Sequence, residues 1–186
     1  MLVENVLIVD PVDGEYIGTI EFEDVIFEIK KSKKSNYEHI IMPAFVDPHI
    51  HGIKGIDTMM ASQKDFERFK EYEALEGVWY FQPTTVTCPL DELRKIKIPS
   101  ELKLHIEGPF IAPKRKGAHN ESYIQSPPKD VRELEQYLPL SSIGMLTVAP
   151  EYDSFLDFAE SCELNNIRIS IGHTDATFAQ AKKAFE

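Results

Sequence analysis

Cysteine is scarce in this chain of 186 residues, which holds only Cys88 and Cys162, far apart and without a Cys-x-x-Cys pair. So few cysteines argue against a disulfide framework and suit a protein of a reducing compartment. We therefore expect both thiols to be unpaired, with Cys162 packed on a helix.

Long apolar runs are also missing. The first one, Val6–Val9, is broken by Asp10 and Pro11, and no run approaches the ~20 apolar residues that a membrane-spanning helix needs. The sequence therefore predicts a cytoplasmic protein with no secretory leader and no membrane partner.

Positive charge is the third deficit, because 20 Lys and Arg residues stand against 31 Asp and Glu residues and give a net charge of -11. No basic stripe with interleaved aromatic residues is present, which argues against nucleic acid as a partner. The one basic cluster, Lys30–Lys34, is expected to be a solvated turn rather than a phosphate site.

The chain otherwise has an ordinary globular composition, with 42% hydrophobic and 27% charged residues. Residues 1–41 read as short strands joined by turns, which predicts a small β domain. Over residues 42–186, strand-like runs alternate with amphipathic helical windows. The predicted strands are Ala44–His51, Val78–Val86, Leu102–Phe110, Ile143–Ala149 and Ile167–His173. The predicted helices are Ser62–Glu76, Asp91–Ile96, Asp130–Leu138, Tyr152–Asn165 and Thr177–Phe185.

This alternation is typical of parallel βαβ units and leaves two architectures, a doubly wound sheet or a closed (β/α)8 barrel. No Gly-x-Gly-x-x-Gly follows the first strand, which counts against a dinucleotide fold. Polar residues gather at the carboxyl ends of the strands, where barrel enzymes carry their catalytic groups. They are His49, His51, Thr84, Thr85, Glu107, Glu151 and His173. The predicted fold class is therefore α/β, a (β/α)8 barrel, of which about five units are present where about eight are needed for closure.

His49 and His51 stand one residue apart at the end of the first predicted strand. Side chains at alternate positions of a strand share a face, so both rings can bind one cation. Such a pair is also found as surface or core decoration, so its weight depends on what the other strands offer.

Glu107 and His173 end two further strands. Glu107 alternates with Leu104 and Ile106, which predicts an inward carboxylate, while a solvent-exposed glutamate at an edge is the alternative. The Gly-Pro that follows allows close approach of the backbone to a ligand and favours a site. His173 shares the alternation of the preceding isoleucines, so it is either a structural residue or is aimed inward by a bend at Gly172.

The strand ends together offer nitrogen and oxygen ligands of the kind that bind zinc, iron(II) or a similar divalent metal. The four candidate metal ligands are His49, His51, Glu107 and His173. The basic loop Lys114–Asn120 is either a solvated loop or a substrate-binding loop, in which His119 hydrogen-bonds a polar ligand and the cations favour anions.

These motifs carry a family resemblance. Phe45–Gly52 resembles the first-strand motif of the amidohydrolase superfamily, which comprises metal-dependent hydrolases on a (β/α)8 barrel. Four later motifs are similar, in order and spacing, to those of one branch, the N-acetylglucosamine-6-phosphate deacetylases. They are Leu104–Phe110, Lys116–Asn120, Val148–Glu151 and Gly172–Thr177. The resemblance runs through nearly the whole chain.

The resemblance implies a role for each candidate residue. Glu107 and His173 would bind the principal metal, and Ala118 with His119 would contact the sugar. His49 and His51 would serve an optional second metal, so that one or two ions are bound. Residues 1–41 would be the first part of a small β-sandwich, and residues 42–186 the first half of the hydrolase barrel.

The same resemblance places a third metal ligand, the catalytic aspartate and much of the phosphate site beyond Glu186, so no catalytic base is assigned within the chain. The implied reaction is hydrolysis of the N-acetyl group of N-acetylglucosamine 6-phosphate to glucosamine 6-phosphate and acetate, in amino-sugar catabolism. The complete enzyme is expected to be a homodimer.

Two other functions stay open from the sequence. One is another amidohydrolase, such as a related amino-sugar deacetylase, a dihydroorotase-like enzyme or a deaminase, because these share the His-x-His pair. The other is a non-catalytic metal-binding fragment, because half a barrel exposes apolar edges and lacks the general base.

Overall fold

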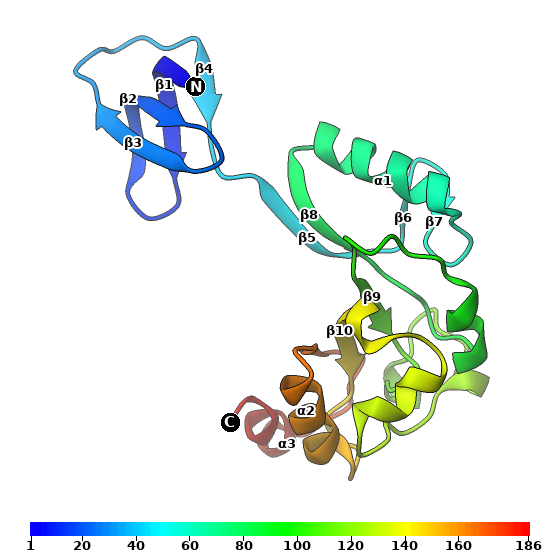
Figure 1. The fold of residues 1–186 in the computed structure, drawn as a ribbon. Helices are drawn as coiled ribbons and strands as arrows, with labels where there is room; N and C mark the ends of the chain where they lie inside the picture. The colour runs from blue at the N-terminus through cyan, green and yellow to red at the C-terminus, as the bar shows by residue number, and fades with distance from the viewer. The chain divides into compact units, whose positions relative to one another are not determined.

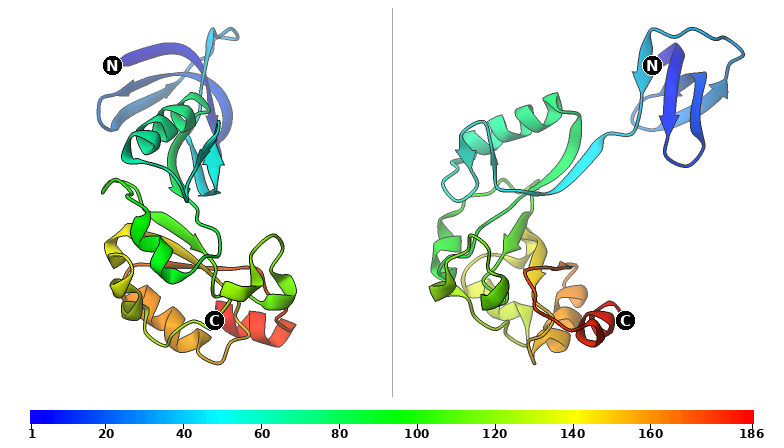
Figure 2. Two further views of the ribbon diagram at one scale, coloured as in Figure 1. Left: turned by 90° about the vertical axis from the view of Figure 1, so that its right-hand side faces the viewer. Right: turned by 180° about the vertical axis from the view of Figure 1, so that it is seen from behind.

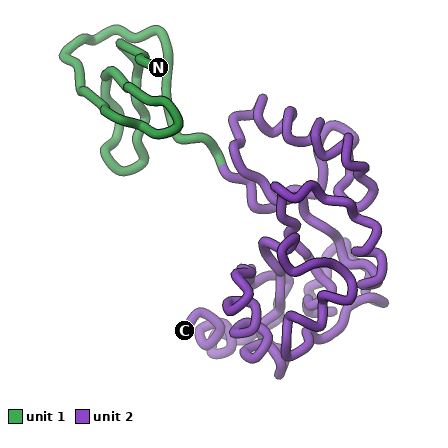
Figure 3. Tube along the Cα trace, in the orientation of Figure 1, with its two compact units in different colours: residues 1–45 green, residues 46–186 purple.

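The computed structural model describes residues 1–186 and divides them into two compact units, Met1–Phe45 and Val46–Glu186 (Figure 3). Each unit has its own hydrophobic cluster. The longest helix has 13 residues, and none of the helices combines the length and the apolar character that crossing a bilayer demands.

The first unit is a four-stranded sheet with the order β3-β2-β1-β4 (Figure 1). β1 and β2 form an antiparallel hairpin, β3 extends it, and β4 runs parallel to β1. Alternate residues of β1 and β2, namely Val6, Ile8 and Ile20, make its core. The strands are β1 (Leu2–Asp10), β2 (Gly14–Phe22), β3 (Ile26–Lys31) and β4 (His39–Ile41).

The turn between β1 and β2 is fixed by a side chain. Asp10 Oδ1 accepts the backbone N–H groups of Val12 and Asp13, both at 2.8 Å, in the usual manner of an aspartate that opens a turn. The basic cluster differs in part from its prediction, because Lys30 and Lys31 belong to the fully exposed strand β3 rather than to a turn.

The second unit is an α/β arrangement in which strands alternate with helical segments. β9, β10 and β11 form a parallel sheet with β10 in the middle, and β5 pairs with β8. A parallel bridge between Thr84 and His105 connects the chain just after β8 to β9. The strands are β5 (Phe45–Ile50), β8 (Val78–Pro83), β9 (Leu104–Glu107), β10 (Ile143–Val148) and β11 (Arg168–Ile171).

Three α-helices lie in this unit, and two of them begin with a capping box. Ser62 caps α1 (Gln63–Leu75) together with Asp65, and Thr177 caps α3 (Phe178–Phe185) together with Gln180. α1 packs against β8 through Phe69, whose ring stacks on Phe81 at 4.9 Å. α2 (Phe155–Leu164) and α3 lie side by side in the views of Figures 1 and 2.

Two predicted helices are 3₁₀ segments instead. The window Asp91–Ile96 forms η1 (Leu90–Lys95), and the window Asp130–Leu138 forms η4 (Val131–Gln136). Each has only six residues, and a run that short gains too few hydrogen bonds to offset the cost of nucleating an α-helix.

A small hairpin was missed by the sequence reading. β6 (Gly52–Ile53) and β7 (Ile56–Asp57) pair antiparallel directly after His51. Their two-residue turn, Lys54 and Gly55, has positive φ at both positions, 46° and 86°. This is the backbone that tight hairpins need, but a lysine in the first position gives little signal for it.

The apolar core of the second unit lies on one face of the sheet formed by β9, β10 and β11. Leu104 and Ile106 of β9 pack with Leu146 and Val148 of β10 in the main apolar cluster, which α2 covers with Phe158. Burying a side chain of this size stabilises the fold by about 1.5–3 kcal/mol. Because strand side chains alternate, the intervening residues of β9 point to the opposite face, where the polar cluster lies.

Candidate metal centre

The His-x-His pair lies at the end of β5 with both rings directed at one point. His49 Nε2 and His51 Nε2 are 3.3 Å apart, and they lie 3.7 and 3.1 Å from Oε2 of Glu107. The period-2 geometry of a strand thus brings the two imidazoles together, as the sequence predicted.

Glu107 is the centre of the cluster. Its side chain is only 7% exposed, so the alternative of a solvent-exposed edge glutamate is wrong. Its backbone N–H donates to Thr85 Oγ1 at 3.2 Å, which fixes the end of β9. A buried carboxylate is costly without partners, and Glu107 has imidazole nitrogens around both oxygens.

His173 reaches the same carboxylate from the end of β11. Its Nε2 lies 3.1 Å from Oε1 of Glu107. Ile169 and Ile171 pack on the apolar side, so regular alternation would send the ring of His173 away from Glu107. His173 instead has a φ of 50°, and this left-handed conformation directs its ring towards Glu107.

The expected bend at Gly172 is therefore one residue out of place. The positive φ belongs to His173, while Gly172 serves a steric purpose. A Cβ at position 172 would lie 3.1 Å from the Thr147 methyl group, which is tighter than ordinary van der Waals contact.

His119 comes from the basic loop and is 8% exposed. Its Nε2 lies 3.3 Å from Oε2 of Glu107, and its ring is edge-on to that of His173. The neighbouring Ala118 is exposed. Two cations of this loop, Lys114 and Arg115, form ion pairs with the Asp175 carboxylate at 3.2 and 2.7 Å. These hydrogen bonds keep the pKa of Asp175 below its usual value.

Backbone partners fix which ring nitrogen carries hydrogen in His51 and His173. A carbonyl oxygen can only accept, so Nδ1–H of His51 donates to Thr84 at 3.2 Å and Nδ1–H of His173 donates to Arg115 at 2.8 Å. In the neutral rings, the Nε2 atoms of these two histidines are therefore free lone pairs. Both lone pairs point towards the Glu107 carboxylate, which is the orientation that lets nitrogen and oxygen bind the same ion.

His119 has the opposite tautomer. The backbone N–H of Thr87 donates to its Nδ1 at 3.1 Å, and the Thr87 hydroxyl lies 2.8 Å from the same atom. Since Nδ1 accepts, Nε2 carries the hydrogen of the neutral ring. Burial lowers the pKa of His119, against the opposing effect of Glu107, and so favours this neutral form.

The residues present fit a divalent metal. The two candidate groups, His49 with His51 and Glu107, and Glu107 with His119 and His173, each keep their ligand atoms within 4.8 Å of one another. Zinc bonds of about 2.0–2.1 Å place neighbouring tetrahedral ligands roughly 3.3 Å apart. The separations of 3.1–3.7 Å around Glu107 meet this requirement.

The sequence reading missed a supporting layer around the cluster. His105 donates Nδ1–H to the Pro48 carbonyl at 2.9 Å and accepts at Nε2 from the Thr147 hydroxyl at 2.7 Å. Its ring lies edge-on to His49, with centroids 4.9 Å apart. The alternation that selected Glu107 also selects His105, but sequence gives no sign of the partner on β5.

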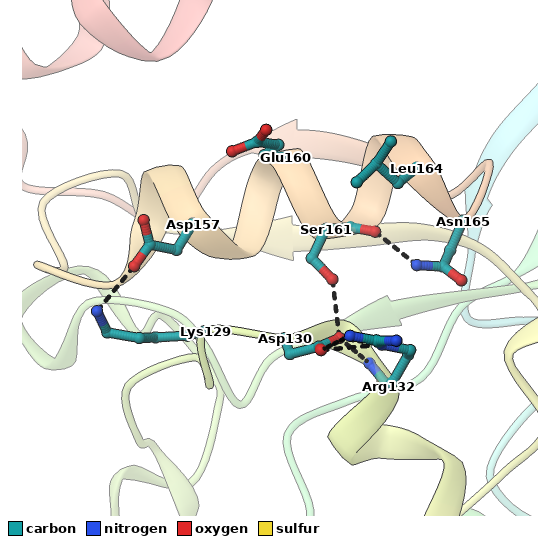
Figure 4. A pocket seen from close by; sticks show the side chains of 8 residues that line it. All are labelled: Lys129, Asp130, Arg132, Asp157, Glu160, Ser161, Leu164 and Asn165. Atoms are coloured by element: carbon teal, nitrogen blue, oxygen red, sulfur yellow. Dashed lines mark hydrogen bonds and ion pairs between the residues drawn. The ribbon is translucent and has the colours of Figure 1, made fainter.

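Another hollow in this unit lacks such chemistry. Figure 4 shows it between α2 and η4, where Ser161 donates to Asp130 at 2.9 Å. Its charged groups are largely satisfied by one another, as in the Lys129–Asp157 pair at 2.8 Å. It contains no histidine, so the Glu107 cluster remains the candidate centre.

The chain is similar to curated deacetylases of amino-sugar phosphates. No protein-family model matches the chain. It is 30% identical over 161 residues to the N-acetylgalactosamine-6-phosphate deacetylase of Escherichia coli O157:H7, which is 79% of this chain and 42% of that protein. It is 31% identical over 184 residues to the N-acetylglucosamine-6-phosphate deacetylase of Bacillus subtilis, 90% of this chain and 46% of that protein. The chain spans less than half the length of these curated relatives.

Solved structures give the same result. The N-acetylglucosamine-6-phosphate deacetylase of Thermotoga maritima is 38% identical, with a TM-score of 0.82, over 100% of this chain and 52% of that one. The Mycobacterium smegmatis enzyme of the same name has a TM-score of 0.83 over 100% of this chain and 57% of that one, and at 22% identity it shows the fold alone. In sequence and in fold, the chain is thus similar to the N-terminal part of the N-acetylglucosamine-6-phosphate deacetylases.

Proposed function

We propose that this chain provides the metal-binding half of a hydrolase that removes the N-acetyl group of N-acetylglucosamine 6-phosphate, giving glucosamine 6-phosphate and acetate. The observation that carries the proposal is the arrangement around Glu107. Lone pairs of His51 and His173 and an N–H of His119 converge on one buried carboxylate.

The proposed fold is the first five βα units of a (β/α)8 barrel over residues 42–186, preceded by part of a β-sandwich in residues 1–41. The parallel pairing of β9, β10 and β11 supports it. So does the agreement with the Thermotoga maritima structure over the whole chain. In such barrels, the carboxyl ends of the strands carry the site, and the five groups of the cluster come from strand ends and one following loop.

We assign Glu107 and His173 to the principal metal, and His49 with His51 to a second one. Nitrogen and oxygen donors suit zinc or iron(II). When bound, such an ion supplies Lewis acidity, which lowers the pKa of water to about 7 and polarises an amide carbonyl.

His119 is assigned to the substrate rather than to the metal, together with the adjacent Ala118. Its Nε2–H is the donor that an amide carbonyl oxygen needs as it gains negative charge, and Thr87 holds the ring in that tautomer. Amide hydrolysis also needs a base that takes a proton from water and returns it to the departing amine. Glu107 does not suit this task, because both of its oxygens face imidazole nitrogens.

A second substrate candidate is N-acetylgalactosamine 6-phosphate. The Escherichia coli O157:H7 relative is named for that sugar, at an identity similar to that of the glucosamine-named relatives. The two sugars differ in the orientation of one hydroxyl, so the same cluster can serve either of them. The homodimer and the cytoplasmic location stay predictions.

The activity test is a chimera in which this chain replaces the corresponding N-terminal part of the Thermotoga maritima enzyme. We expect it to release acetate from N-acetylglucosamine 6-phosphate with added Zn²⁺ or Fe²⁺, and to lose this activity with chelator. The Glu107→Gln chimera is the matched control. A folded chimera that binds metal yet hydrolyses neither sugar phosphate, beside an active parent enzyme, would rule the proposal out.

A further inference from the structure

We propose that Glu151 is a positioning residue that holds the loop after β11 and thereby keeps His173 in the left-handed conformation that aims its Nε2 at Glu107. The proposal concerns the same cluster, so its metal readout rests on the proposed function. Its structural readout does not.

Glu151 forms hydrogen bonds with the two residues that follow His173. It lies three positions after the end of β10 and is half-buried. Its Oε2 accepts the Thr174 hydroxyl at 2.5 Å, and its Oε1 accepts the Asp175 backbone N–H at 2.7 Å. One carboxylate therefore binds the loop through both oxygens, and hydrogen bonds to a charged acceptor are about twice as strong as neutral ones.

The conformation of His173 needs such support. The left-handed region is sterically unfavourable for a residue with a Cβ, and the sequence has no glycine at this position to avoid the strain. Without a constraint, the loop would relax to negative φ. Regular alternation would then turn the ring away from Glu107.

Two other contacts hold His173 itself. The Ala112 backbone N–H donates to the His173 carbonyl at 2.8 Å, and the ring nitrogen Nδ1 donates to Arg115. Both anchors belong to the segment after β9. Glu151 supplies a third anchor from the segment just after β10, the middle strand of the sheet.

The chemistry of Glu151 argues against a direct role in the site. Each of its oxygens accepts a hydrogen bond from the loop, and Glu151 belongs to neither group of candidate metal ligands. The side chain of Asp175 pairs with Lys114 and Arg115 instead. Asp175 is thus held by its backbone through Glu151 and by its side chain through the basic loop.

The test uses the 186-residue chain with Glu151→Gln, which keeps the size of the side chain but can accept only one of the two hydrogen bonds well. The matched control is Glu160→Gln, because Glu160 is an exposed carboxylate on α2. In metal-free protein, we expect amide exchange at Asp175 to quicken at least about tenfold, with the core amide of Leu146 unchanged. Unchanged exchange at Asp175 in Glu151→Gln would overturn the proposal.

The second readout is Co²⁺ binding, followed by the visible spectrum of the ion. Loss of a supporting hydrogen bond lowers metal affinity by about 10–100-fold, so we expect that range for Glu151→Gln and no change for Glu160→Gln. Glu151→Asp keeps both oxygens and should recover part of the affinity. Affinity and spectrum unchanged in Glu151→Gln would also overturn the proposal.

The two readouts separate the two proposals. If the unaltered chain binds no Co²⁺, the proposed metal centre fails, while exchange at Asp175 still decides the role of Glu151. If Glu151→Gln does not fold, Thr174→Val removes the hydrogen bond to Glu151 together with the one from the Ala176 N–H, and Thr174→Ser retains both. Faster Asp175 exchange in Thr174→Val alone would support the anchor, and equal exchange in both variants would overturn it.

Discussion

Thr87 donates its backbone N–H to Nδ1 of His119 at 3.1 Å, which leaves the hydrogen of the neutral imidazole on Nε2. His51 and His173 have the reverse arrangement, with Nδ1–H bound to carbonyl oxygens. Histidines that lie equally close to Glu107 are thus chemically different. A distance criterion alone groups His119 with the metal ligands, whereas its hydrogen-bond partner marks it as a donor.

This difference predicts opposite outcomes for two substitutions. His119→Ala should leave the metal affinity within a few-fold of the unaltered chain, since a donor is removed and no ligand is lost. His173→Ala should weaken binding by more than the roughly 10–100-fold typical of supporting residues. Titration with Co²⁺ or Zn²⁺ measures both.

In the active chimera, His119→Ala should lower kcat by about 10²–10³, the usual loss for one donor to a developing oxyanion. Metal lost from His119→Ala would place His119 among the ligands and contradict its assignment to the substrate.

Gly108 is predicted to be irreplaceable for steric reasons. Its φ is 74°, and a Cβ there would lie 1.9 Å from Thr87 Oγ1. Gly108→Ala should therefore cost the left-handed strain of roughly 1–2 kcal/mol plus about 1–3 kcal/mol of overpacking. Urea unfolding measures the loss.

Gly55→Ala is the matched control for Gly108→Ala. Gly55 has a φ of 86° with nothing within 4 Å of the added Cβ, so only the strain should appear. Equal losses in the two variants would show that the contact with Thr87 carries no energy.

The sequence predicted the parts of this structure that depend on local pattern. The strands that carry His49 and Glu107 follow from their apolar runs, and the helix after Ser62 follows from its amphipathic window. The α/β class follows from the alternation of strands and helices. The grouping of polar residues at strand ends included four members of the cluster, His49, His51, Glu107 and His173, whereas His119 was predicted from the basic loop.

What the sequence could not predict depends on contacts between distant segments or on a single dihedral angle. The left-handed turn at His173 overrides the alternation, and nothing in the residue type announces it. The tautomer of His119 depends on Thr87, 32 positions away. The support that His105 gives to Pro48 spans 57 positions, and such pairings emerge only when the strands are assembled.

The core should depend strongly on Phe158. Its side chain is fully buried and meets Phe110 edge-on, with ring centroids 5.4 Å apart. Phe158→Ala should destabilise the chain by about 3–5 kcal/mol, because it removes buried apolar surface and leaves a cavity. Leu164→Ala on the same helix removes a side chain that is 77% exposed and should change the stability by less than about 0.5 kcal/mol. Comparable losses in thermal unfolding would contradict the assignment of Phe158 to the core.

The buried thiol of Cys162 should be unreactive until the chain unfolds. Burial raises its pKa from 9.0 to about 12. A rise of that size reduces the thiolate near pH 8 by about a thousandfold, and the thiolate is the species that reacts. Iodoacetamide should therefore label Cys162 in urea but not in the folded chain.

The raised pKa of Cys162 also predicts alkaline sensitivity. The folded state holds this proton more tightly than the unfolded state, so the contribution to stability is present below pH 9 and is lost as the pH rises towards about 12. Cys162→Ala should flatten this part of the stability curve, as followed by unfolding at several pH values. The same loss of stability in Cys162→Ala would assign the effect to other groups.

Glu107 and His173 lie 66 positions apart in the chain and meet at a single point. An ion held between them would close a loop of that length. A permanent bridge over such a loop lowers the conformational entropy of the denatured chain, which stabilises the folded state by about 4 kcal/mol. The ion would then act as a removable cross-link as well as a reagent. Removal of the ion by a chelator should therefore lower the free energy of unfolding while leaving the chain folded, and bound metal should slow proteolysis.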